Sequence, residues 1–128
     1  MNAEGFGAAA PRDLLRGLTS EERERVLEVG HRRRVRRGTI LYNQGDHPGW
    51  TYILQEGTVR TFRTSRGGRQ FTVGFWREHD IIGGPDIFSY APRLLSAQTT
   101  TDSVLIGFTA DELDRLIDEL ALRHLVQL

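Results

Sequence analysis

Short runs of β-forming residues separated by glycine turns constrain this fold more than any other feature of the sequence. Four such runs lie over residues 39–42, 51–54, 58–63 and 70–73. Gly67-Gly68, between the last two runs, predicts a tight hairpin. A further strand pair is predicted over about 97–101 and 104–108. Many short strands with glycine turns favour a sandwich or a small barrel over alternating β and α units.

Two capping boxes predict helices on either side of these strands. A hydroxyl residue three positions before a glutamate satisfies free N–H groups at a helix start. Thr19 and Glu22 have this spacing and predict a helix over about 20–29 that ends near Gly30. Thr109 and Glu112 predict a second helix with an apolar face formed by Leu113, Leu116, Ile117 and Leu120. Residues 1–12 carry no pattern, and we expect a flexible tail there.

The composition limits the classes of function. The chain has 128 residues, which suits one domain, and its 17 arginines balance 17 acidic residues. This balance argues against a surface that grips nucleic acid or an anionic membrane as a whole. The absence of cysteine removes disulfides and thiolate chemistry. Without a signal-peptide pattern or an apolar run of about 20 residues, we expect a soluble, cytoplasmic protein with no membrane partner.

The run HRRRVRR over residues 31–37 is the densest charge cluster. Such a run can bind phosphate, DNA or an acidic partner. The alternative is a solvated strand, with alternate residues facing water in salt bridges. Because the whole chain is neutral, we favour the solvated strand.

Four segments in order suggest a family. They are RGTILYNQGD (37–46), YILQEGTVR (52–60), HDIIG (79–83), and Ser96-Ala97 with the strand that leads to Phe108. Their order and spacing, from about Leu14 to Leu128, resemble the effector domain of the Crp/Fnr superfamily of bacterial transcription factors. The resemblance implies a mainly β fold: an antiparallel double-stranded β-helix, or jelly roll, of the cyclic-nucleotide-binding type, with flanking N- and C-terminal helices.

The resemblance also implies a domain organisation. Residues 13–120 would form the β-roll domain with its helices, and residues 121–128 would begin a truncated dimerisation helix. Leu120, Leu125 and Leu128 would then be exposed and support a homodimer in the parent protein. DNA binding would need a helix-turn-helix domain that is absent from this sequence.

The stretch GGPDIFSYAPRLLSA, residues 83–97, matches the family's phosphate-binding cassette. In the family the cassette begins Gly-Glu and ends Arg-Ser/Thr-Ala; the Glu binds the ribose 2′-hydroxyl and the Arg pairs with the cyclic phosphate. Gly83, Ser96 and Ala97 match this pattern. The Glu position falls on Gly84 and the Arg position on Leu95.

Both departures remove ligand contacts. Charge-assisted hydrogen bonds are worth about 1.5–3 kcal/mol each, so losing two weakens binding by roughly a hundred- to ten-thousandfold. We therefore expect a degenerate cassette that does not hold cyclic AMP tightly. One alternative is that Arg93, two residues before Leu95, swings inward and replaces the missing arginine. Trp76 and Phe88 flank the cassette and either pack in the core or line a small apolar pocket for another effector.

Other chemistry finds less support. Of the four histidines (His31, His47, His79 and His124), His124 is the best candidate for a haem ligand. The metal-ligand spacing of cupins, a nucleophile elbow, a P-loop and a paired-carboxylate motif are all missing. We therefore expect no enzyme, no bound metal and no cofactor.

These observations predict the sensor domain of a Crp/Fnr-like transcriptional regulator with an unknown small-molecule effector. The alternative is a stand-alone regulatory or protein-interaction module on the same roll. A haem-based gas sensor is a third, minor hypothesis, which a Soret band in the purified protein would test. A gene that continues past Leu128 into a helix-turn-helix pattern would favour the regulator.

Overall fold

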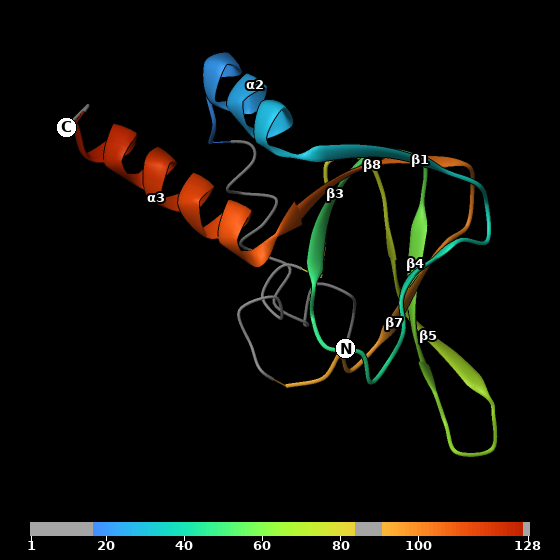
Figure 1. Ribbon diagram of the computed structural model, residues 1–128. Coiled ribbons are helices and arrows are strands. Elements are labelled where there is room, and N and C mark those ends of the chain that lie inside the picture. The colour runs from blue at the N-terminus through green and yellow to red at the C-terminus, as the bar shows by residue number, and fades with distance from the viewer. Residues whose placement is uncertain (1–16, 84–90, 127–128) are drawn as a thin grey trace.

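Two four-stranded antiparallel sheets form the body of the protein. The computed structural model describes residues 17–83 and 91–126, with side chains described up to residue 121 (Figure 1). Sheet A contains, in order, β1 (His31–Val35), β8 (Ser103–Thr109), β3 (Trp50–Glu56) and β6 (Ile81–Ile82). Sheet B contains β2 (Ile40–Tyr42), β7 (Ser96–Thr99), β4 (Val59–Thr64) and β5 (Gln70–Trp76). The prediction of an antiparallel roll with flanking helices is confirmed.

Both helices begin as their capping boxes predict. In α2 (Ser20–Val29), Glu22 donates its main-chain N–H to the Thr19 hydroxyl, and the Glu22 carboxylate accepts from the main-chain N–H of Thr19. Thr109 and Glu112 make the same pair of bonds at the start of α3 (Ala110–Val126). Arg25 of α2 binds Glu119 of α3 at 3.0 Å, which ties the two helices together. No described helix is long and apolar enough to cross a membrane.

The core consists of two clusters separated by sheet A. β8 has buried residues along nearly its whole length, because it faces the helices on one side and the roll interior on the other. Phe108 and Ile106 pack against the helices, whereas Leu105 packs inside the roll. The helix-side cluster contains Leu18, Val26, Ile106, Phe108, Leu116 and Leu120. The interior cluster contains Tyr52, Leu54, Val59, Ile82, Ala97 and Leu105.

The predicted hairpin is present, but the predicted last strand pair is wrong. β4 and β5 pair directly around the Gly67-Gly68 turn and project beyond the roll (Figure 1). β7 and β8 both form where the sequence predicts strands, yet they belong to different sheets. Residues 100–102 carry the chain from sheet B to sheet A, as a roll requires. Strand propensity is local, whereas the choice of pairing partner depends on the whole fold.

The arginine run forms an exposed edge strand. Only Val35 of β1 is half-buried, and the other four residues are exposed, so the expected alternation is not observed. β1 borders one neighbour, β8, and therefore leaves much of its side-chain surface in solvent. Arg33 donates a hydrogen bond to the Tyr52 hydroxyl at 3.2 Å. His31 binds Glu112 at 2.7 Å and makes an edge contact with the Trp50 ring.

The expectation that Leu120 is exposed is wrong. Its side chain is 6% exposed and packs in the helix-side cluster with Leu116 and Val26. α3 runs without a break from Ala110 to Val126, so the residues after 120 continue the same helix. The side chain of Leu125 and all of Leu128 lie outside the described residues, as does the predicted tail over residues 1–12. Leu120 therefore stabilises the fold of this chain and is not available to a partner.

Candidate functional site

The two ends of the cassette meet at one end of the roll. Gly83 follows β6 in sheet A, and Arg93 precedes β7 in sheet B. The cassette position Gly84 and the candidate pocket residue Phe88 lie between them in the sequence, outside the described residues. The backbone of Gly83 has φ +77°, a left-handed conformation that residues other than glycine rarely adopt. The glycine that opens the family's cassette is thus needed here for the backbone turn.

The Arg93 side chain is buried and directed at Gly83. It is 3% exposed. Its Nη1 donates to the Gly83 carbonyl at 3.0 Å, and its Nη2 donates to the Trp50 carbonyl at 2.6 Å. The guanidinium also lies 4.1 Å from the centre of the Tyr42 ring. Carbonyl oxygens and an aromatic face both stabilise a cation, which explains how an arginine can be buried here.

The main chain of Arg93 is held as firmly as its side chain. Its N–H donates to the Asp46 carbonyl at 2.7 Å, and its own carbonyl accepts from Gly45 N–H at 2.8 Å. The Thr51 hydroxyl also donates to the Gly83 carbonyl, at 3.2 Å. An anion that approached the guanidinium would have to compete with the carbonyls of Gly83 and Trp50. In this arrangement Arg93 links the ends of the cassette.

The remaining described cassette residues are also engaged in the fold. The Ser96 side chain is 4% exposed, and its hydroxyl accepts from the Gln44 main-chain N–H at 2.8 Å. Ala97 is completely buried in the interior cluster. Leu95, which the sequence analysis predicts at the family's arginine position, is half-buried, and its neighbour Leu94 is exposed. No described residue of the cassette other than Arg93 carries a positive charge.

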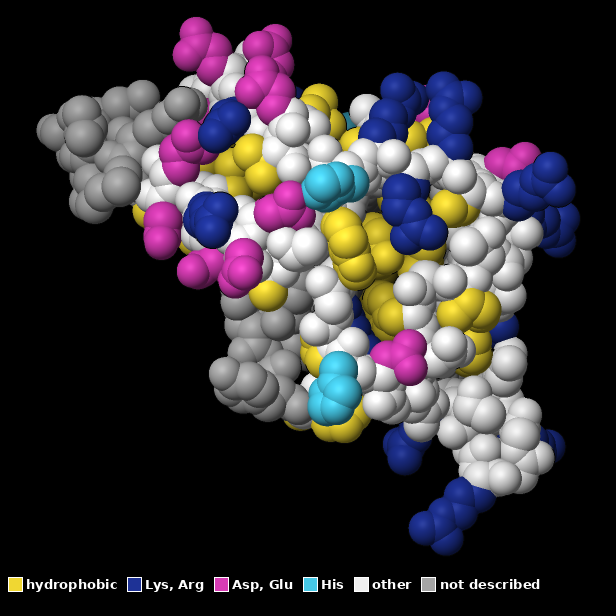
Figure 2. Space-filling view, viewed as in Figure 1, with side chains coloured by type: hydrophobic (Ala, Val, Ile, Leu, Met, Phe, Trp, Pro, Cys, Tyr) yellow, Lys and Arg dark blue, Asp and Glu magenta, His cyan; other side chains and the backbone are white. Residues whose placement is uncertain are grey.

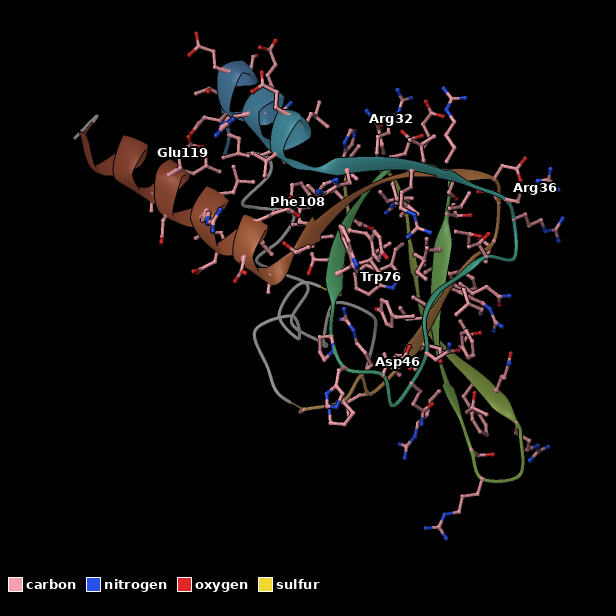
Figure 3. The ribbon with its side chains drawn as sticks, in the orientation of Figure 1. Arg32, Arg36, Asp46, Trp76, Phe108 and Glu119 are labelled. Carbon is pink, nitrogen blue, oxygen red and sulfur yellow. The ribbon has the colours of Figure 1, made fainter. Side chains whose placement is uncertain are left out.

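Trp76 lines the space between the two sheets (Figure 3). Its indole N–H donates to the Thr61 hydroxyl at 3.0 Å, and its ring packs on the interior cluster. Figure 2 shows hydrophobic side chains at the bottom of a hollow between the sheets. Trp76 thus packs on the core and borders this hollow at the same time.

Sequence reasoning missed a second concave site, which lies beside α2. A cavity of about 420 Å³ opens between α2, sheet A and the turn before β6. Val26 and Ile53 give it an apolar floor, and Gln55 places a buried side-chain oxygen in its wall that has no hydrogen-bond partner in the described structure. Its lining consists of Arg23, Val26, Leu27, Ile53, Leu54, Gln55, Arg77, Glu78, His79, Asp80 and Ile106. No sequence motif signals this cavity, because its walls come from segments far apart in the chain.

The described histidines occupy surface positions. His31, His47 and His79 are all exposed, and His79 adopts a left-handed turn conformation with φ 76°. The side chain of His124, the residue proposed for haem, lies outside the described residues, so that hypothesis stays a prediction. Within the described part of the chain, no three histidine, aspartate or glutamate side chains gather as a metal site would require.

The carboxyl group of Glu112, near the start of α3, has a lowered pKa. The pKa of Glu112 is lowered from its usual value, first by the hydrogen bond from the Thr109 main chain and then by the hydrogen bond from His31. Both bonds favour the ionised carboxylate. The shift follows from helix capping and lies outside the cassette.

Comparison with known proteins gives consistent matches. The family model for the cyclic nucleotide-binding domain matches residues 32–119. The cyclic AMP receptor protein of Thermus thermophilus is 29% identical over 109 residues, which cover 85% of this chain and 50% of that protein. The transcriptional activator protein anr of Pseudomonas aeruginosa is 28% identical over 122 residues, covering 93% of this chain and 50% of that protein.

A solved structure agrees with these matches. The crystal structure of the Thermus thermophilus catabolite activator protein has a TM-score of 0.78 and 29% sequence identity. The match covers 85% of this chain and 51% of that chain. The chain therefore spans about half the length of the relatives it matches.

Proposed function

Because this chain belongs to the cyclic nucleotide-binding domain family, with transcriptional regulators of the Crp/Fnr superfamily among its relatives, we propose that it is the sensor domain of such a regulator. We propose further that its cassette is degenerate and does not bind cyclic AMP tightly. The sensor responds instead to another small molecule. It has no catalytic role.

The hydrogen bonds that the Arg93 side chain makes to the protein's own backbone are the observation that carries this proposal. A family-like site needs a cation whose N–H groups face the ligand phosphate. Here the one described cationic side chain of the cassette donates to the carbonyls of Gly83 and Trp50. The family's arginine position holds Leu95, which offers no hydrogen-bond donor from its side chain. Cyclic nucleotide binding would therefore have to break existing buried bonds.

The wider role of the parent protein follows from its relatives. In a regulator, the effector biases a two-state equilibrium of the dimer, and a separate domain reads the DNA. We propose a homodimer in the parent protein and DNA binding through a domain outside this sequence. This chain by itself then shows no sequence-specific DNA binding.

Calorimetric titration with cyclic AMP and cyclic GMP, up to several millimolar ligand, tests the proposal. We expect no saturable heat for either nucleotide. Arg93→Met serves as a matched variant, measured under conditions where it is folded: if the wild type binds and the folded variant does not, Arg93 has replaced the missing arginine. Micromolar binding by the wild type would overturn the degenerate-cassette proposal and leave the family membership unaffected.

A further inference from the structure

One row of side chains crosses the outer face of sheet B. Ile40 of β2 lies opposite Gln98 of β7, Gln98 lies opposite Arg60 of β4, and Arg60 lies opposite Phe75 of β5. Residues paired across neighbouring strands share a face of the sheet, so these four side chains form a line across all its strands. We call this line the cross-strand row. Its apolar ends are exposed, Ile40 by 41% and Phe75 by 67%.

Neutral partners hold Arg60 in the middle of the row. Nε and Nη2 donate to the Gln98 side-chain oxygen at 3.1 and 2.8 Å. Nη2 also donates to Gln70 at 2.7 Å, and Nη1 donates to the Thr72 hydroxyl at 3.3 Å. The guanidinium covers the Phe62 ring at 4.1 Å. Among the described residues no carboxylate binds Arg60, so its charge is fixed in position and not neutralised.

The segment that contains β4 and β5 differs in charge from the two helices. Residues 57–77, which contain β4 and β5, hold five arginines and no acidic residue. The two helices carry nine acidic residues against four arginines, the acidic ones being Glu21, Glu22, Glu24 and Glu28 in α2, and Asp111, Glu112, Asp114, Asp118 and Glu119 in α3. Figure 2 shows acidic side chains gathered over the helices, with arginines among them, and further arginines over β1 and at the tip of the β4–β5 hairpin. The four strands of sheet B themselves contain no acidic residue and two arginines, Arg60 on the outer face and Arg63 on the other face.

We propose that the outer face of sheet B docks a partner protein through an extended acidic segment. A carboxylate of that segment accepts a hydrogen bond from the remaining N–H of Arg60, on Nη1. Two apolar side chains of the segment cover Ile40 and Phe75. Neighbouring strands lie about 4.8 Å apart, so the row spans about 14 Å. An extended chain advances about 3.3 Å per residue, which places the apolar side chains four residues apart with the acid between them.

The chemistry of the row fits a protein better than a nucleic acid. Phosphate backbones are gripped by several adjacent cations, whereas this row has one arginine between two apolar side chains. Arginine and aromatic residues are enriched at protein interfaces. Neither α2 nor α3 packs on this face, because both lie on the side of sheet A (Figure 1). The proposal is independent of which effector the roll binds.

A two-dimensional ¹⁵N NMR titration of the whole chain tests the proposal. The probe is a capped peptide, Gly-Leu-Ser-Glu-Ser-Leu-Gly, and its counterpart has Gln in place of Glu. We expect the Glu peptide to shift the resonances of Gln98, Thr72 and Phe75, and the Gln peptide to bind at least about tenfold more weakly.

Matched variants separate docking from a structural role of Arg60. Phe75→Ser and Arg60→Met should each weaken binding of the peptide at least about tenfold. The methionine of Arg60→Met still covers the Phe62 ring, so this variant keeps the packing and removes the charge. Phe71 is the control, because it is also exposed on β5 but lies opposite Arg63, on the other face of the sheet. Phe71→Ser should bind the peptide like the wild type.

Three outcomes would overturn the proposal. The first is the absence of shifts up to several millimolar peptide. The second is a random-sequence duplex DNA that shifts the same resonances at lower concentration than the peptide, which would make the face a nucleic-acid surface. The third is concentration-dependent broadening of these resonances without peptide, lost in Phe75→Ser, which would show that a second copy of the chain covers the face.

Discussion

Arg93 donates a 3.0 Å hydrogen bond to the carbonyl of Gly83, and this bond joins the first residue of the cassette to its last described segment. The bond crosses from sheet A to sheet B, so it links the ends of two strands that do not pair with each other. In a family whose cassette arginine holds a phosphate, an arginine of this chain holds its own backbone. In this chain the arginine therefore stabilises the roll by linking the two sheets.

Replacing Arg93 should destabilise the protein. Arg93→Met removes two hydrogen bonds from a charged donor; the Gly83 carbonyl keeps its bond from Thr51, whereas the Trp50 carbonyl loses its buried donor. We expect a loss of about 3 kcal/mol in the free energy of unfolding, measured by urea denaturation. Arg66→Met, at an exposed position of the hairpin turn, should change it by less than about 0.5 kcal/mol. Equal small effects would show that the Arg93 bonds contribute nothing to stability.

Restoring an arginine at the family position should restore part of the affinity for cyclic AMP. Leu95→Arg supplies one charge-assisted contact to the phosphate, which corresponds to about a ten- to hundredfold gain in affinity by calorimetry. Leu94→Arg adds the same charge at a position that is 68% exposed and should gain nothing. If both variants gain equally, the effect is non-specific attraction, and the assignment of Leu95 to the arginine position fails.

The Gly83 turn should not tolerate a side chain. A Cβ at Gly83 would lie 2.6 Å from Nη1 of Arg93, and its φ of +77° is strained for other residues. We expect Gly83→Ala to cost about 1–3 kcal/mol in thermal denaturation. Gly68 has φ +84° but nothing within 4 Å, so Gly68→Ala reports the strain alone, about 1 kcal/mol. A smaller loss for Gly83→Ala than for Gly68→Ala would contradict the close contact with Arg93.

The Glu112 cap should make stability depend on pH in the acidic range. Its pKa is lowered in the folded state from the ordinary value of 4.5, so the ionised form stabilises the fold. This stabilisation is complete above the unfolded pKa and is lost as the pH falls through the folded pKa. The melting temperature of the wild type should exceed that of Glu112→Gln at neutral pH, and the difference should shrink below about pH 4.5.

The exposed Glu24 of α2 provides the control for this measurement. Glu24→Gln should leave the wild-type pH profile nearly unchanged. A difference between the wild type and Glu112→Gln that is constant from neutral to acidic pH would show that ionisation of Glu112 does not contribute.

Truncating Leu120 should affect folding and not self-association. Leu120→Ala leaves a cavity between α3, α2 and β8 and should cost about 2–5 kcal/mol. Ile117→Ala, on the same helix but 39% exposed, should cost less than about 1 kcal/mol. Sedimentation at matched concentrations should give the same oligomeric state for the wild type and for the folded fraction of Leu120→Ala. A shift toward monomer in that fraction would show that Leu120 contributes to a dimer interface.

The sequence by itself determined the local elements of this protein. The capping boxes at Thr19 and Thr109 specify both helix starts, and the Gly67-Gly68 turn specifies a hairpin, because each depends on residues within one turn of the chain. The order of these elements also identified the family. The sequence also predicts, position by position, that Gly84 and Leu95 stand where the family has Glu and Arg, since this prediction concerns residue types alone.

Only the tertiary structure decided which residues these elements bring together. The burial of Leu120, the placement of β7 and β8 in different sheets and the bonds of Arg93 to Gly83 and Trp50 all depend on contacts between distant parts of the chain. The cross-strand row likewise exists only through the register of four strands. Local propensities fix where a strand or helix forms, but burial and pairing are properties of the folded whole, because they require residues far apart in the sequence to meet.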